Sequence, residues 1–196
     1  MDSLEHWVRW GGYLLLVGII FAETGLLVGF FLPGDSLLFA AGIVAAQGYL
    51  DIRAVILLLI VAGVLGNSAG YWFGRKAGQP LFQRPNSKLF KKEYLERAKA
   101  FYDQHGGVAI VLARFVPIVR TFAPIVAGAI EMPYARFTLY NLLGSAGWIT
   151  SCCLAGYFLG NVPVIKKHIE LMILAIVAVS VLPIILHSLK EQRKGH

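Results

Sequence analysis

The sequence contains few charged residues. Of its 196 residues, 15% are Asp, Glu, Lys or Arg and 57% are hydrophobic, whereas soluble domains carry about 25% charged residues. Too few polar side chains are present to cover the surface of a soluble globule. This composition indicates a protein that lies in a lipid bilayer.

Residue spacing typical of a metal site is also missing. Cys152 and Cys153 are adjacent in an apolar segment, so in a helix their side chains point in different directions and we interpret them as packed thiols. The five histidines lie at the edges of the apolar segments. We therefore expect no metal and no cofactor.

Three segments lack Asp, Glu, Lys and Arg altogether. A hydrocarbon core of about 30 Å requires about 20 apolar residues of helix, and residues 54–73, 137–160 and 171–189 meet that length. We predict that all three cross the membrane, with the last span covering residues 169–189.

Basic residues are concentrated in one internal segment and at the end of the chain. Residues 75–105 contain eight Lys and Arg against three acids, and a basic tail follows at 190–196. Because basic loops stay on the cytoplasmic side, we place both segments in the cytoplasm. The net charge of +7 is then matched by anionic lipid headgroups rather than by nucleic acid. Apolar residues at helical spacing predict an amphipathic interfacial helix within 75–105.

This orientation constrains residues 106–130. The last two spans cross out and back from the cytoplasmic tail, so this segment begins and ends on the same side. Its two apolar arms of about ten residues each reach about half the membrane thickness. We therefore expect a re-entrant helical hairpin, broken at Pro117 and Pro124.

The N-terminal half has the same order of short motifs. The matching pairs are Phe31-Leu32-Pro33 with Phe115-Val116-Pro117, Ala41-Gly42 with Ala127-Gly128, and Gly70-Tyr71-x-x-Gly74 with Gly156-Tyr157-x-x-Gly160. A weak internal repeat is typical of transporters with inverted topology. We predict repeat one over residues 10–74 and repeat two over residues 106–160.

The expected fold is therefore an all-α polytopic membrane protein with a single membrane domain over residues 1–196. Each inverted repeat combines a re-entrant hairpin with a transmembrane helix, and a further C-terminal transmembrane helix follows. The side of the membrane on which the N-terminus lies stays open, because residues 12–32 are long enough to cross alone.

Four charged residues are expected at membrane depth: Glu23 and Asp35 in repeat one, and Arg114 and Arg120 in repeat two. A charge at the centre of a membrane helix costs about 3 kcal/mol on insertion-based scales, so it normally faces a partner or a cavity. If the hairpins meet, these residues form two ion pairs. The pairs either fasten the repeats together or form a functional site, and we favour function because buried ion pairs often add little stability.

Helix breaks at Pro33-Gly34 and Pro117 free backbone groups that only protein or water can satisfy. The arginines there favour an anionic ligand, because the guanidinium fork suits phosphate oxygens. Asn67, Asn141 and Trp148 could line the same cavity. The small residues beside them favour close helix packing as the alternative.

These residues, in this order, resemble the DedA family, also known as SNARE-associated or VTT-domain proteins. The resemblance covers about residues 10–165 and rests on Glu23, Phe31-Leu32-Pro33-Gly34-Asp35, Gly70-Tyr71-x-x-Gly74, Arg114-Phe115-x-Pro117-x-x-Arg120 and Ala127-Gly128-x-x-x-Met132. It implies a bacterial inner-membrane lipid transporter with opposed re-entrant hairpins, essential acids and arginines, and proton coupling. The implied lipid is undecaprenyl phosphate, or a phospholipid such as phosphatidylethanolamine.

We therefore expect a flippase or scramblase rather than an enzyme. Arg114 and Arg120 would bind the phosphate headgroup, while Glu23 and Asp35 would serve as counter-charges or proton carriers. A scaffold or channel without a lipid substrate is one alternative, and an intramembrane lipid phosphatase is another. The lipid, the direction of transport, the coupling ion and the oligomeric state stay open.

Overall fold

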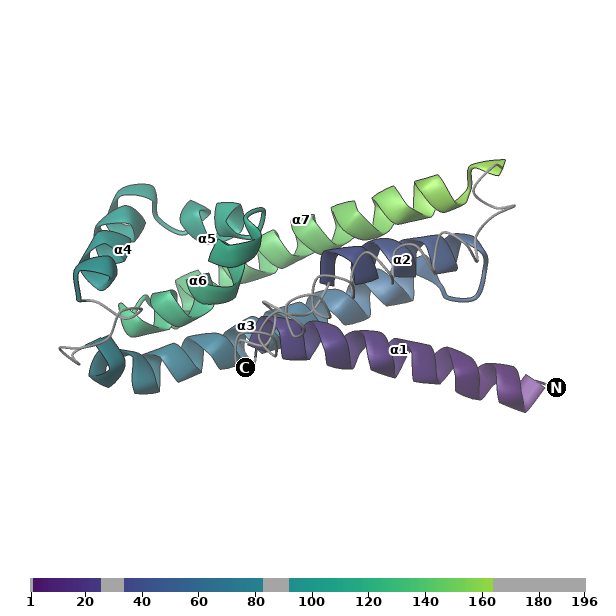
Figure 1. Cartoon of the computed structure of the whole chain (residues 1–196), viewed down its shortest axis with the longest axis horizontal. Coiled ribbons are helices and arrows are strands. Elements are labelled where there is room, and N and C mark those ends of the chain that lie inside the picture. The colour runs from purple at the N-terminus through teal and green to yellow at the C-terminus, as the bar shows by residue number, and fades with distance from the viewer. Residues whose placement is uncertain (1, 26–33, 83–91, 164–196) are drawn as a thin grey trace, which may run out of the picture. The chain divides into compact units, whose positions relative to one another are not determined.

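The computed structural model describes residues 2–25, 34–82 and 92–163. Within these ranges the chain is helical and contains no strand, as Figure 1 shows. The helices are α1 (Asp2–Gly25), α2 (Gly34–Ala46), α3 (Ile52–Phe82), α4 (Lys92–His105), α5 (Val108–Ala113), α6 (Pro117–Ala129) and α7 (Tyr134–Gly160). The all-α prediction is confirmed for this part of the chain.

Within the described part of the chain, two helices are long and apolar enough to cross a membrane. They are Ile52–Ala77 within α3, with 26 residues, and Tyr134–Gly160, with 27 residues. At 1.5 Å per residue both exceed the hydrocarbon thickness of about 30 Å. Large apolar side chains are exposed along them, including Leu57, Leu65, Leu139, Leu143 and Phe158. Such a surface suits contact with lipid.

Some boundaries differ from the expected ones. Helix α3 continues past residue 73 to Phe82, so the first part of the expected basic loop is helical. Arg75 is the first charged residue after the apolar segment, but a charged residue does not by itself end a helix, and α3 continues through it. Helix α4 supplies the helix expected within the loop. The expected C-terminal span at 169–189, the tail at 190–196 and Pro33 lie outside the described residues.

The chain divides into two compact units. The described parts of Met1–Ile19, Phe31–Leu58 and Ile149–His196 form one of them, here called the terminal unit. The described parts of Ile20–Phe30 and Leu59–Trp148 form the central unit. Helices α1, α3 and α7 contribute residues to both.

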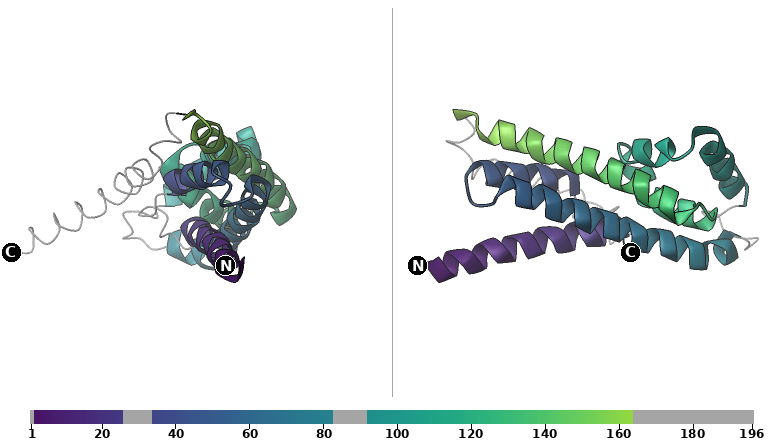
Figure 2. Two further views of the ribbon diagram at one scale, coloured as in Figure 1. Left: turned by 90° about the vertical axis from the view of Figure 1, so that its right-hand side faces the viewer. Right: turned by 180° about the vertical axis from the view of Figure 1, so that it is seen from behind.

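Each unit packs a short helix on a long one through glycine. In the central unit, a Cβ atom on Gly128 of α6 would overlap the carbonyl oxygen of Tyr71 in α3. In the terminal unit, a Cβ atom on Gly42 of α2 would likewise overlap the carbonyl oxygen of Cys153 in α7. Helix α2 runs along the C-terminal end of α7 (Figures 1 and 2). The reciprocal glycine contacts are Gly74 with Ile125 and Gly156 with Phe39. Both units therefore use the same backbone-to-backbone contact.

Aromatic packing holds the turn between α6 and α7 against α3. Tyr71 is fully buried, its hydroxyl donates a hydrogen bond to the Met132 carbonyl, and its ring stacks on Phe137 at 4.7 Å. Ile110 and Ala127 complete this buried cluster. The tyrosine of the Gly-Tyr-x-x-Gly motif is thus a core residue of the central unit.

Helix α6 ends in a Schellman motif. The Glu131 amide donates to the Gly128 carbonyl and the Met132 amide donates to the Ala127 carbonyl, both at 3.0 Å. Glu131 has a φ of 57°, in the left-handed region where glycine is usual and where another residue costs about 1–2 kcal/mol. Its carboxylate also lies at the negative end of the helix dipole. Glutamate is therefore unfavourable for the stability of this turn on two counts.

The glycine contact between α6 and α3 leads to a stability prediction. Gly128→Ala is expected to lower the free energy of unfolding by about 1–3 kcal/mol, because the added methyl group overlaps backbone atoms that cannot move independently. Gly147→Ala in α7 is the control, since nothing lies within 4 Å of its Cβ position and alanine favours a helix. Thermal unfolding of both variants in detergent measures the difference. Equal stability of the two variants would contradict the packing described.

Candidate functional site

Two arginines flank the break between α5 and α6. Arg114 caps the C-terminus of α5, and Pro117 opens α6 after Val116, whose backbone is extended. Proline suits a first helical position because an amide there has no intrahelical acceptor, and it forces the preceding residue out of helical geometry. The chain therefore leaves the helix at the expected place. Arg120 follows in the first turns of α6.

Pro124 does not break the helix, and that expectation is wrong. It lies inside α6, which continues to Ala129. Proline cannot donate a hydrogen bond to the Arg120 carbonyl four residues earlier, but the loss of one such bond need not end a helix. Pro124 is buried and faces Gly70 of α3, whose Cβ position lies 3.4 Å from the proline Cβ. Packing on α3 supports this turn.

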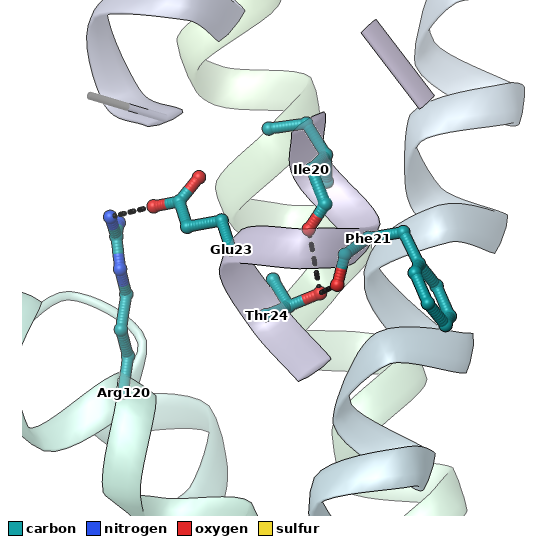
Figure 3. A network of polar contacts seen from close by, with 5 residues as sticks. All are labelled: Ile20, Phe21, Glu23, Thr24 and Arg120. Carbon is teal, nitrogen blue, oxygen red and sulfur yellow. Dashed lines mark hydrogen bonds and ion pairs between the residues drawn. The ribbon is translucent and has the colours of Figure 1, made fainter. Parts of the chain in front are cut away.

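Arg120 is held by a carboxylate and an aromatic ring. Its guanidinium Nη2 lies 2.7 Å from Oε1 of Glu23, which is 3% exposed on α1. Figure 3 shows the two side chains extending toward each other. The guanidinium carbon also lies 4.5 Å from the centre of the Trp148 ring on α7, within the range of a cation–π interaction. The charge of Arg120 is thus matched on two sides.

Thr24 fixes the neighbouring turn of α1. Its hydroxyl donates to the Ile20 carbonyl at 2.8 Å, as Figure 3 shows. A Cβ atom on Gly66 of α3 would overlap this hydroxyl, so α1 and α3 are in close contact here. This contact fixes the helical turn that carries Glu23.

Arg114 is held mainly by an amide. It is 5% exposed, and its Nη2 donates to Oδ1 of Asn141 in α7. Asn141 in turn donates to the Val64 carbonyl of α3 at 3.2 Å. The buried Nε–H of Arg114 has no hydrogen-bond partner among the described residues, and the Cβ position of Gly144 is 3.1 Å away. One strong donor in the site is therefore available.

These side chains line a small cavity in the central unit. The lining residues are Glu23, Thr24, Asn67, Arg114, Arg120, Thr121 and Trp148. The cavity volume of about 10 Å³ is roughly the space that one water molecule needs. Two cations and one carboxylate face it, so the lining carries an excess positive charge. The site is closed to any larger ligand in this conformation.

Five of the seven charged and cavity-lining residues predicted from the sequence line this cavity, namely Glu23, Asn67, Arg114, Arg120 and Trp148. Asn141 reaches it indirectly through Arg114, whereas Asp35 is half-buried in the first turn of α2, in the terminal unit. Gly34 is buried at the start of α2. The sequence interpretation missed Thr24 and Thr121. Each directly follows a membrane-depth charged residue, which is the signal that could have revealed them.

Comparisons with known proteins identify the family. The VTT domain model matches residues 32–158. Protein DedA of Escherichia coli (strain K12) is 44% identical over 183 residues, which cover 92% of this chain and 84% of that protein. The chain belongs to the DedA family. It is a membrane protein, in agreement with the two long apolar helices.

Two further members extend the comparison. Inner membrane protein YghB of Escherichia coli (strain K12) is 36% identical over 156 residues, covering 80% of this chain and 71% of YghB. An uncharacterized membrane protein of Mycobacterium leprae (strain TN) is 42% identical over 179 residues, covering 90% of this chain and 80% of its own. No solved structure matches the chain.

The amide contact of Arg114 is open to a stability test. Asn141→Ala removes a hydrogen bond to a buried charged group and is expected to lower the free energy of unfolding by about 1.5–3 kcal/mol. Asn161→Ala is the control, because Asn161 is exposed and donates only to the end of α7, at the Tyr157 carbonyl. Its effect should stay within about 0.5 kcal/mol. Equal thermal unfolding of the two variants in detergent would show that Asn141 does not support Arg114.

Proposed function

We propose that this DedA-family protein is a lipid transporter of the flippase or scramblase type. Its substrate would carry an anionic phosphate headgroup, with undecaprenyl phosphate as the first candidate. The observation that carries the proposal is the Nε–H of Arg114, a buried donor that has no hydrogen-bond partner among the described residues and lies beside a cavity lined by a second arginine. Buried donors are normally paired. A phosphate oxygen would satisfy this one.

The charge balance of the cavity supports an anionic ligand. Among the described residues, Arg114 and Arg120 line it together with one carboxylate, Glu23. A buried cation whose described partner is a neutral amide is costly in a low-dielectric site. An arriving phosphate adds the missing negative charge, and the guanidinium forks offer it several donors.

The lengths of α5 and α6 support the re-entrant hairpin. They contain 6 and 13 residues, so at 1.5 Å per residue each is shorter than a hydrocarbon core of about 30 Å. We infer that they enter and leave on one side of the inner membrane. In this topology the basic segment 75–105 and the C-terminus lie in the cytoplasm, as their charge favours. The shared glycine packing of α2 and α6 supports an origin in inverted repeats.

The mechanism begins with opening of the closed cavity. A headgroup phosphate enters and engages Arg114 and Arg120, which displaces Glu23 from Arg120. A carboxylate that loses its counter-charge in a low-dielectric site favours protonation, so lipid binding and proton uptake become linked. Asp35 is proposed as a second proton carrier. Rocking of the two repeats would expose the headgroup to the other leaflet while the hydrocarbon chain stays in lipid.

Removal of either arginine is the direct test. In proteoliposomes with a fluorescent polyprenyl phosphate, Arg114→Ala and Arg120→Ala should slow translocation at least about tenfold, because each loses hydrogen bonds to a charged group. Arg120→Lys keeps the charge but loses the fork, so an intermediate rate is expected. Arg53→Ala is the control, since Arg53 is exposed at the start of α3.

Folding of each variant is checked by gel filtration and thermal unfolding. Translocation at the wild-type rate in both alanine variants would rule out the proposed role. Release of inorganic phosphate from the labelled lipid by the wild-type protein would instead indicate a phosphatase.

Proton coupling is tested at Glu23. Glu23→Gln keeps a hydrogen-bond acceptor for Arg120 but cannot exchange a proton, so translocation should persist while its acceleration by an imposed pH gradient is lost. Glu96→Gln is the control, because Glu96 is exposed on α4. Rates measured with and without the gradient provide the comparison. A full gradient response in Glu23→Gln would argue against this acid as the proton carrier.

A further inference from the structure

Trp148 is an uncharged partner of Arg120 in the buried site. It lies on α7 in the central unit and is 4% exposed. The guanidinium carbon of Arg120 lies over its ring, 4.5 Å from the ring centre, and both side chains line the cavity beside Arg114. A cation–π contact is stronger where water is excluded than at an exposed surface. The ring therefore stabilises this charge in a place where water cannot.

The ionic and the aromatic contact of Arg120 differ in what a ligand can replace. Glu23 accepts a hydrogen bond from Nη2 at 2.7 Å (Figure 3), and a phosphate oxygen competes for such N–H donors. The ring attracts the charge through the negative face of its π system, and it neither titrates nor binds phosphate through that face. The aromatic contact can therefore persist while the carboxylate is exchanged for phosphate.

Trp148 and Arg120 also differ in conformational freedom. A tryptophan side chain rotates about only two χ angles and presents a rigid surface, whereas burial of an arginine costs much more side-chain entropy. The preceding turns of α7 are fixed by Asn141 and Ser145, which are fully buried, and Asn141 donates to the Val64 carbonyl of α3. The ring is thus a rigid support beside a flexible cation.

A second pair of the same residue types provides a comparison. Arg75 lies 5.5 Å from the centre of the Trp72 ring on α3, but Trp72 is 44% exposed. Neither residue lines the cavity of Arg114 and Arg120. This pair is therefore a control for changes in an aromatic ring that do not concern the buried site.

We propose that Trp148 is a positioning residue for Arg120 during headgroup binding, an inference that rests on the proposed transport function. When phosphate displaces Glu23, the ring keeps the guanidinium at the cavity and its N–H donors directed at the phosphate. Without the ring, Arg120 loses its fixed geometry once Glu23 leaves and must be ordered again by the lipid. The ring acts through the arginine and does not itself contact the headgroup.

Fluorinated tryptophans test this role, because each fluorine weakens the negative face of the ring with little change in its size. The chain contains four tryptophans, and all are replaced together by mono-, di- or trifluorotryptophan. The mole fraction of fluorescent polyprenyl phosphate that gives half-maximal translocation in proteoliposomes should rise stepwise. A total rise of about threefold to tenfold is expected when one flexible side chain must be ordered on binding. The maximal rate should stay near that of the unsubstituted protein.

Three variants assign the response to Trp148 and Arg120. Trp148→Phe keeps a weaker ring, so its half-maximal mole fraction should rise about threefold, and fluorination of the other tryptophans should not change it further. Trp72→Phe is the matched control and should respond to fluorination as the wild type does. In Arg120→Ala the residual translocation should not respond, because the cation under the ring is absent.

A purely structural role of the ring would reduce the amount of active protein. The maximal rate would then fall at a constant half-maximal mole fraction, and that result would overturn the proposal. A fluorine response that persists in Trp148→Phe or in Arg120→Ala, or that disappears in Trp72→Phe, would also overturn it. A wild-type protein that moves no polyprenyl phosphate overturns the transport function and this inference together, whereas normal transport without a fluorine response overturns the inference alone.

Discussion

The ion pair of Arg120 with Glu23, 2.7 Å apart and nearly out of contact with solvent, brings together parts of the chain that are far apart in sequence. A guanidinium in such surroundings requires a nearby counter-charge, because its hydration has been removed. Glu23 supplies that charge from α1, and Trp148 adds its ring from α7. Asn141 extends the same polar network from Arg114 to the backbone of α3. The position of α6 in the central unit depends on these contacts.

Glycine makes this network possible by allowing helices to approach closely. Gly66 leaves room for Thr24 beside Glu23, and Gly144 leaves room for the side chain of Arg114. Gly128 allows α6 to pack closely on α3 at Tyr71. In a membrane, helices gain little from hydrophobic association and rely on such packing and on interhelical hydrogen bonds. The small residues and the buried charges are therefore parts of one arrangement.

The burial of Glu23 and Arg114 could be predicted from the sequence, because a charged residue within an apolar segment normally faces a partner or a cavity. The helical structure of the long apolar segments could also be predicted from the sequence. Three features could not be predicted from the sequence, because each depends on tertiary contacts. Asn141 was predicted as a cavity-lining or a packing residue, and its hydrogen bond with Arg114 is evident only from the structure. Pro124 was predicted to break the helix, but its packing on α3 supports the turn. Glu131 adopts the left-handed backbone of a Schellman motif. A glycine at this position would have predicted the end of the helix, whereas glutamate does not.

The two cavities of the central unit differ in how charge can select a ligand. Around Arg114 and Arg120 the charges are buried and unequal in number, so electrostatic energy is large and the sign of the ligand matters most. The second cavity, of about 360 Å³, lies at the α6–α7 turn and is lined by Lys99, Asp103, Glu131 and Arg136 among others. These four side chains are exposed and balanced in charge, so water screens each one and only a ligand that matches several at once gains much. Under the proposed function, the buried site therefore selects for the negative charge of the phosphate rather than for the rest of the lipid.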